Sequence, residues 1–112
     1  MKTVVAVIKH HKLEEVCQAL STVSVSGMTI SEVKGYGRQK GRFENYRGSD
    51  SGVTFLPKVR VEVAVDDEQV EKTVGAIAAA ARTGQIGDGK IFVSALDHAV
   101  RIRTGEIDSQ AI

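Results

Sequence analysis

The 112-residue sequence contains a single cysteine, Cys17, and no long apolar segment. A lone cysteine excludes an internal disulfide and a cysteine-rich metal site, and its place on an apolar helical face indicates a core side chain. The apolar run within residues 1–9 is too short for a signal peptide or a membrane span. We therefore expect a soluble, cytoplasmic protein without direct membrane insertion.

The chain also lacks an excess of charge of either sign. Its 15 Lys and Arg residues balance 14 Asp and Glu residues, which leaves a formal net charge of +1. No overall field favours a nucleic acid or a membrane, so an anion site must come from local clustering. Because only Tyr36, Phe43 and Tyr46 could serve as aromatic platforms beside the basic loop, nucleic acid is the least favoured partner.

Recognisable catalytic sets are absent from the sequence. It contains no His-Ser-Asp arrangement, no paired carboxylates and no His or Cys residues at metal-binding spacing. His10 and His11 are adjacent and would not share a face of a strand, while His98 stands alone. The sequence thus predicts a protein that is not an enzyme and has no catalytic residues.

What the chain does contain is a regular succession of strand and helix patterns. Strands are predicted at residues 3–8, 28–34, 59–65 and 90–96, and helices at residues 12–23 and 66–81. Asp66 and Gln69 suggest a capping box for the second helix, and Gly84 suggests its C-cap. The order predicts one α+β domain over residues 1–112, the ferredoxin-like βαββαβ fold with helices on one face of the sheet.

The third strand has the clearest alternation, because Val59, Val61, Val63 and Val65 would all point to one side. From this alternation we expect other subunits to cover the open face of the sheet in a homo-oligomer.

A long polar segment lies between Tyr36 and Phe55, shows no helix or strand period, and is predicted to end at Pro57. Structureless loops of more than about 12–15 residues in compact domains are typically functional or disordered. Since regular elements flank this one, we expect it to sense a ligand or contact a partner.

Two glycine-containing clusters are candidate anion sites. The segment Gly84–Lys90 resembles a P-loop, but Ile91 stands where Ser or Thr would hold magnesium, and the segment runs from helix to strand. Its glycines still permit close approach of a phosphate to backbone amides. The segment Gly35–Gly41 carries Arg38 and Lys40, and by itself indicates a basic solvated turn.

A third cluster is the pair Arg101 and Arg103, whose side chains would lie on one side of an extended segment. Such a pair could bind phosphate through bidentate hydrogen bonds, and it is equally compatible with two solvated arginines at the edge of a strand. Micromolar binding needs about −8 kcal/mol, whereas each hydrogen bond to a charged group contributes roughly 1.5–3 kcal/mol. Several clusters must therefore converge, which predicts one polyphosphate site shared between subunits.

The chain resembles the PII nitrogen-regulatory signalling proteins over essentially its whole length. The matching runs are residues 33–41, 46–48, 55–59, 80–93 and 100–106. The resemblance implies a homotrimer of ferredoxin-like subunits that binds ATP or ADP in the clefts between subunits, and 2-oxoglutarate beside ATP and Mg²⁺. It also implies a T-loop at about residues 37–55, a phosphate-binding loop at about 82–90 and a C-terminal segment at about 100–112.

The resemblance assigns roles to individual residues. The implied nucleotide-binding residues are Thr29, Gly37, Arg38, Ala64, Gly87, Asp88, Gly89 and Lys90, with Arg101 and Arg103 from a neighbouring subunit. The implied 2-oxoglutarate site comprises Gln39, Gly41, Lys58 and Gly87, with Gln39 also placing magnesium. Ligands would organise the loop root at residues 37–41, and its tip would contact a regulated target such as a transporter or a metabolic enzyme.

The sequence departs from the family pattern at several places. Ser51 stands where many members carry the tyrosine that accepts a nucleotidyl group, so nucleotidylation there is not expected. Ser49 matches a position that is phosphorylated in some members and is the candidate modification site. Ala64 is smaller than the expected aliphatic residue, and His10-His11 replaces a Pro-Phe pair. Two alternatives remain open: a trimeric metal-tolerance protein of the same fold, and a nucleotide-hydrolysing enzyme.

Overall fold

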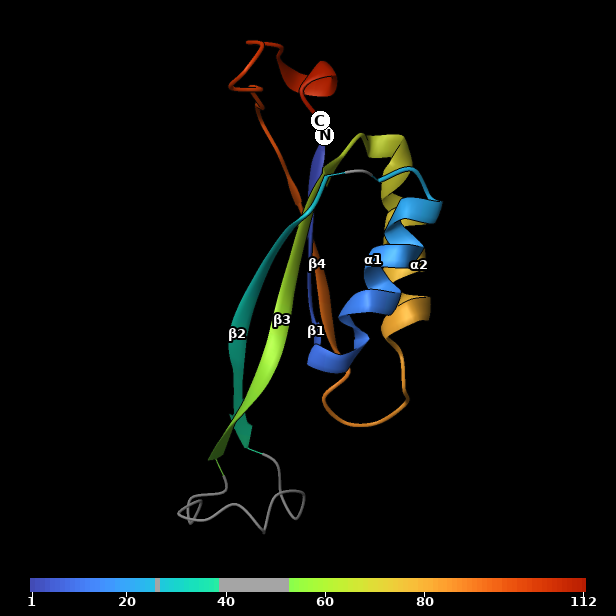
Figure 1. Ribbon diagram of the computed structural model, residues 1–112, viewed down its shortest axis with the longest axis vertical. Helices are drawn as coiled ribbons and strands as arrows, with labels where there is room; N and C mark the ends of the chain where they lie inside the picture. Colours follow the sequence, from blue (N-terminus) through green and yellow to red (C-terminus); the bar gives the residue numbers. More distant parts are fainter. Residues whose placement is uncertain (26, 39–52) are drawn as a thin grey trace.

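The computed structural model describes residues 1–25, 27–38 and 53–112. Its strands are β1 (Lys2–Lys9), β2 (Thr29–Arg38), β3 (Val53–Val65) and β4 (Gly89–Ala95), and they form one antiparallel sheet in the order β2-β3-β1-β4. Helices α1 (Leu13–Thr22) and α2 (Val70–Ala81) lie together on one side of the sheet (Figure 1). The α+β fold with the ferredoxin-like topology is confirmed, and β1 is an interior strand as expected.

The core lies between the sheet and the two helices. Val4, Ala6 and Ile8 alternate along β1 and are at most 1% exposed. The four valines of β3, residues 59, 61, 63 and 65, are at most 5% exposed and belong to the same cluster as Val16, Leu20 and Ile77 from the helices. The valine alternation therefore reflects cover by the helices and gives no sign of other subunits; that other subunits cover the open face of the sheet stays a prediction.

The open face of the sheet is chemically mixed. Register places Glu62 and Phe92 on either side of Val5, and Arg60 and Lys90 on either side of Val7. The Arg60 guanidinium forms an ion pair of 2.9 Å with the Glu62 carboxylate, and Phe92 is 55% exposed. Apolar and paired charged groups thus share the face that the helices leave uncovered.

Strands β2 and β3 form a hairpin that projects beyond the other strands (Figure 1). Their pairing continues to Arg38 opposite Val53, whereas β1 ends where Lys9 meets Lys58. Both ends of the segment predicted as loop therefore belong to strands, and Pro57 lies inside β3 instead of ending the loop. Proline is tolerated there because β3 has only β2 as a neighbour beyond the end of β1.

Local expectations at the helices need correction. Asp66 makes no capping hydrogen bond, because its carboxylate accepts one from the Ser109 hydroxyl at 2.7 Å, and a 3-10 turn at Asp67–Gln69 leads into α2. Helix α2 ends with an extended Arg82 instead of a C-cap at Gly84. Cys17 is half-buried and lies outside the buried core cluster. None of the helices in the described residues is long and apolar enough to cross a membrane.

Candidate functional site

The glycine-rich loop between α2 and β4 is organised around the Asp88 carboxylate. This carboxylate accepts hydrogen bonds from the backbone amides of Thr83 and Gly84, both at 2.8 Å, and from the Thr83 hydroxyl. The Thr83 hydroxyl, followed by these amides and Lys9, holds the pKa of Asp88 well below its usual range. The loop thus contains its own anion, and that anion already engages the amides at the start of the loop.

Two lysines from the sheet meet this loop. Lys9 and Lys58 are cross-strand partners on β1 and β3. The Lys9 ammonium lies 3.0 Å from the Thr83 hydroxyl oxygen and 3.1 Å from the Asp88 carboxylate. The Lys58 ammonium donates to the Gly87 carbonyl oxygen, so the loop is joined to both strands.

The electrostatics of the two lysines favour an incoming anion. Partial burial lowers the pKa of Lys58, the neighbouring Lys9 ammonium lowers it further, and Asp88 opposes both effects. Lys90 is exposed and shares the open face with Lys9 and Lys58, because it pairs with Val7 in the register of β1 and β4. A dianionic or polyphosphate group here would offset the repulsion between neighbouring ammonium groups.

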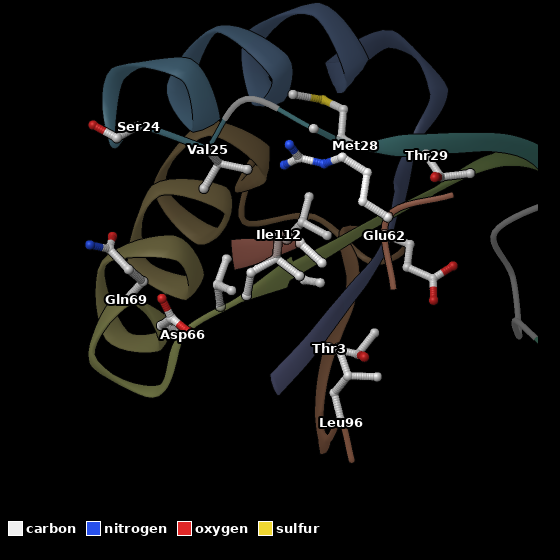
Figure 2. Close-up of a pocket in the computed structure, with 16 residues that line it drawn as sticks. Thr3, Ser24, Val25, Met28, Thr29, Glu62, Asp66, Gln69, Leu96 and Ile112 are labelled. Carbon is white, nitrogen blue, oxygen red and sulfur yellow. The ribbon is translucent and has the colours of Figure 1, made fainter. Parts of the chain in front are cut away.

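A second feature is an open cleft of about 900 Å³ at the other end of the sheet. It is lined by Thr29 and Ala64 from the sheet and by Arg101 from the C-terminal segment, and its volume is typical of a small-molecule site. Figure 2 labels Thr3, Thr29, Leu96 and Ile112 among the residues that line the cleft. Glu62 contributes a carboxylate to the same lining.

The C-terminal segment forms a tight turn that carries Arg101. Val100 pairs with Ile107, the Arg101 amide donates to the Glu106 carbonyl, and the Gly105 amide donates to the Arg101 carbonyl. The prediction of an extended segment with both arginines on one side was therefore wrong. The Arg101 guanidinium binds the Glu106 carboxylate at 2.9 Å, and Arg103 is exposed.

The predicted nucleotide residues fall into two groups within one chain. Thr29, Ala64 and Arg101 line the cleft, whereas the loop residues Gly87 to Lys90 lie beside Lys58. Ala64 lies six positions after Lys58 in β3, which is about 20 Å at the rise of a strand. Figure 1 shows the loop between α2 and β4 at one end of the sheet and the C-terminal segment at the other. A single chain does not bring its Arg101 to its own glycine-rich loop.

The remaining predicted residues lie in or beyond the hairpin. Gly37 and Arg38 pair with Thr54 and Val53 at the end of the hairpin stem. Gln39, Gly41 and Ser49, predicted for 2-oxoglutarate, magnesium and modification, lie outside the described residues, as do Tyr46 and Ser51. In the part of the chain that the structure describes, no three His, Cys, Asp or Glu side chains form a group that could hold a metal.

The sequence reasoning missed Lys9 and Thr83, which complete the loop network. Lys9 ends the first apolar strand and could have been paired with Lys58 once the register of β1 and β3 was assumed. Thr83 directly precedes Gly84 and had no local signal, because its role depends on the fold of the loop around Asp88.

Comparison with known proteins identifies the family. The family profile described as nitrogen regulatory protein P-II matches residues 1–106. A nitrogen regulatory protein P-II of Rhizobium etli is 61% identical, nitrogen regulatory protein GlnK of Escherichia coli is 52% identical and a P-II protein of Nostoc punctiforme is 55% identical. Each alignment spans 112 residues and covers both chains completely. The resemblance read from the sequence is confirmed, and the chain belongs to the PII family of nitrogen regulatory proteins.

Proposed function

We propose that this PII protein is a homotrimeric sensor that binds ATP or ADP in the clefts between its subunits. 2-Oxoglutarate would bind beside Mg-ATP, and the loop between β2 and β3 would pass the ligand state to a target protein. The target would be a transporter or an enzyme of nitrogen metabolism. Nucleotide would act as a signal and not as a substrate.

The observation that carries the proposal is the separation between Arg101 and the glycine-rich loop. If both contact one polyphosphate, the distance of about 20 Å along β3 requires the arginine of a second copy. In a cyclic trimer the same contact repeats three times, so each site would combine the loop of one subunit with the C-terminal segment of its neighbour.

The chemistry of the loop supports a phosphate ligand. Lys9, Lys58 and Lys90 lie on one face beside Gly87, and their positive charge is only partly offset by Asp88. Since the Asp88 carboxylate engages the amides of Thr83 and Gly84, phosphate contacts are expected further along the loop, from Gly87 to Lys90. Lys58 would pair with a carboxylate of 2-oxoglutarate and exchange its contact with Gly87 for that ligand.

The hairpin supports the signalling part of the proposal. Its stem ends at Arg38 and Val53, beyond the sheet region that the helices cover (Figure 1). Arg38 is a predicted nucleotide ligand, and Gln39 directly follows it in the sequence. A ligand held at this root would bias the start of the loop that contacts the target.

Complementation between two variants with weakened ATP binding tests the shared site. Lys90→Ala alters the loop, and Arg103→Ala alters the C-terminal segment; both side chains are exposed, so folding should be preserved. Each variant alone should lose ATP affinity by about tenfold or more in titration calorimetry, because a hydrogen bond to a charged group is lost. Trimers refolded from an equal mixture should regain about one quarter of the high-affinity sites. A cleft is intact only where the unaltered loop of one subunit meets the unaltered C-terminal segment of its neighbour, and each mixed trimer has one such cleft.

Several results would contradict the proposal. Full affinity in both single variants, no recovery in mixed trimers despite verified subunit exchange, or a monomer by light scattering would reject the shared site.

Other measurements separate the alternatives. Sustained phosphate release from ATP would favour the hydrolase alternative, and metal binding without nucleotide binding in equilibrium dialysis would favour the metal-tolerance alternative. Undiminished, ATP-dependent 2-oxoglutarate binding by Gln39→Ala would reject the role given to Gln39. Parallel pull-downs with ATP, ADP, and ATP plus 2-oxoglutarate would test whether partner binding follows the ligands.

A further inference from the structure

Lys9 occupies a position that joins the sheet to the glycine-rich loop. It ends β1, and its ammonium group lies 3.0 Å from the Thr83 hydroxyl oxygen and 3.1 Å from the Asp88 carboxylate. The side chain of Lys9 is 21% exposed and that of Asp88 is 25% exposed, so the pair is only partly screened by solvent. Both Lys9 partners lie in the loop and neither lies in the sheet.

The contacts of these partners extend over the whole loop. Asp88 accepts from the amides of Thr83 and Gly84, and the Thr83 hydroxyl accepts from the Gln85 amide at 3.1 Å. The far side of the loop is also close to Lys9, because a Cβ placed on Gly87 would lie 3.6 Å from both the Lys9 Cε and the Lys58 Nζ. One ammonium group therefore contacts the Thr83 and Asp88 side chains, whose hydrogen bonds connect residues 83–88 of the loop.

Besides Lys9, the sheet contacts the loop through the Lys58 ammonium, which donates to the Gly87 carbonyl oxygen. Gly84, Gly87 and Gly89 all have positive φ, between +84° and +104°, and glycines give the backbone many alternative conformations. A phosphate site requires its amides at fixed positions, so a loop of this composition needs side-chain contacts to hold it.

We propose that Lys9 is a positioning residue. It holds the Thr83 and Asp88 side chains against β1 and thereby sets where the loop from Gly87 to Lys90 meets the nucleotide phosphates. This role rests on the proposed nucleotide site. Lys9 acts through Asp88 and Thr83 and needs no contact with the ligand.

Three variants of the full-length protein test the role. Lys9→Met removes the ammonium group and keeps the length of the side chain, whereas Lys9→Arg keeps a cation with several donors. Lys12→Met is the matched control, because Lys12 is also partly buried, at 18% exposed, and also pairs with one carboxylate, Glu15 at 3.3 Å. The Lys12–Glu15 pair lies within the first turns of the α1 region, outside the loop network.

The expected result is a selective change in the loop. Lys9→Met should weaken ATP binding by about tenfold in titration calorimetry and should speed amide hydrogen exchange at Thr83 and Gly84 to a similar extent. Lys9→Arg should stay within about threefold of the wild type in both measurements, and Lys12→Met should leave both unchanged. Asp88→Asn in the Lys9→Met background should have less than the sum of the two single effects, because the Lys9–Asp88 pair is lost in both, while the other hydrogen bonds of Asp88 are affected only by Asp88→Asn.

Unchanged exchange at Thr83 and Gly84 in Lys9→Met would overturn the proposal, as would equal effects in Lys12→Met or additive effects in the double variant. Should Lys9→Met fail to fold, the failure of Lys9→Arg to preserve exchange protection would have the same meaning. The exchange measurement needs no nucleotide. If the wild-type protein does not bind ATP, the proposed function fails while the exchange result still decides whether Lys9 positions the loop.

Discussion

Gly89 lies so close to Val7 that a Cβ built on the glycine would come within 1.7 Å of the Val7 carbonyl oxygen. The contact occurs where the glycine-rich loop enters β4 and meets β1. Gly89 also has φ +104°, a conformation that side chains disfavour. The strand that follows the loop can thus begin at this place only with a residue that lacks a side chain.

Gly89→Ala is therefore expected to be strongly destabilising. The clash is with backbone atoms, which cannot move aside without disturbing the pairing of β1 and β4, and the positive φ adds a conformational cost. We expect a loss of about 3 kcal/mol or more in the free energy of unfolding, measured by urea denaturation.

Gly84→Ala is the control for this substitution. Gly84 has a similar positive φ, +84°, but a Cβ there would meet nothing within 4 Å. Only the conformational cost of roughly 1–2 kcal/mol should remain. Equal destabilisation by the two alanines would show that backbone conformation, and not the approach to Val7, makes Gly89 necessary.

Gly75→Ala should have the opposite effect. Gly75 lies inside α2, is exposed, and would place a Cβ in open space. Alanine reduces the conformational freedom of the unfolded chain and has a higher helix propensity, so we expect a gain of about 0.5–1 kcal/mol. The measurement is the same denaturation experiment. A loss of stability would indicate that the exposed side of α2 contacts another subunit in solution.

The stability of the protein should fall in acid through Asp88. Hydrogen bonds from the Thr83 hydroxyl and from the amides of Thr83 and Gly84 lower the pKa of Asp88 from its usual 3.8. The folded state therefore binds fewer protons than the unfolded state below that value, and the contribution is complete above pH 3.8 and is lost as the pH falls. Asp88→Asn should flatten the dependence of unfolding free energy on pH below about 4.

Asp67 provides an independent comparison, because its pKa is lowered by a hydrogen bond from the N-terminal ammonium group at 2.9 Å. Since Asp67 lies near the N-terminus and Asp88 lies in the loop, the effects of Asp67→Asn and Asp88→Asn should add. A wild-type acid profile retained in the double variant would mean that other carboxylates control acid unfolding.

The sheet and helices were predictable from the sequence because their patterns reflect burial. The alternation of Val59, Val61, Val63 and Val65 and the spacing of Val16 and Leu20 each match a buried face. The hairpin stem was not predictable in this way. Tyr36 and Phe55 pair there, with ring centroids 5.1 Å apart, but they are 67% and 59% exposed, so no core selects an alternating pattern.

The candidate site was predictable only in part, since its contacts join distant segments. The glycines of the loop and the two arginines could be identified, whereas the Lys9–Asp88 pair and the Asp66–Ser109 hydrogen bond span 79 and 43 residues. The turn at residues 101–105 was also missed, because Arg101 and Arg103 suggest a strand pattern while the Glu106 contacts determine the actual conformation.

The two neighbours of Lys58 should shift its pKa in opposite directions. Burial lowers the pKa of Lys58, the Lys9 ammonium lowers it further, and the Asp88 carboxylate raises it. Lys9→Met should therefore raise the pKa of Lys58 toward 10.5, and Asp88→Asn should lower it further. The pKa can be followed by an NMR pH titration of the Lys58 side chain, assigned with Lys58→Arg.

The folded state binds fewer protons than the unfolded state between the lowered pKa of Lys58 and 10.5, so the free energy of unfolding should rise with pH in that window. The rise should be less steep in Lys9→Met and steeper in Asp88→Asn. Shifts of the same sign in the two variants would mean that a movement of the loop, and not the charge of either neighbour, controls Lys58.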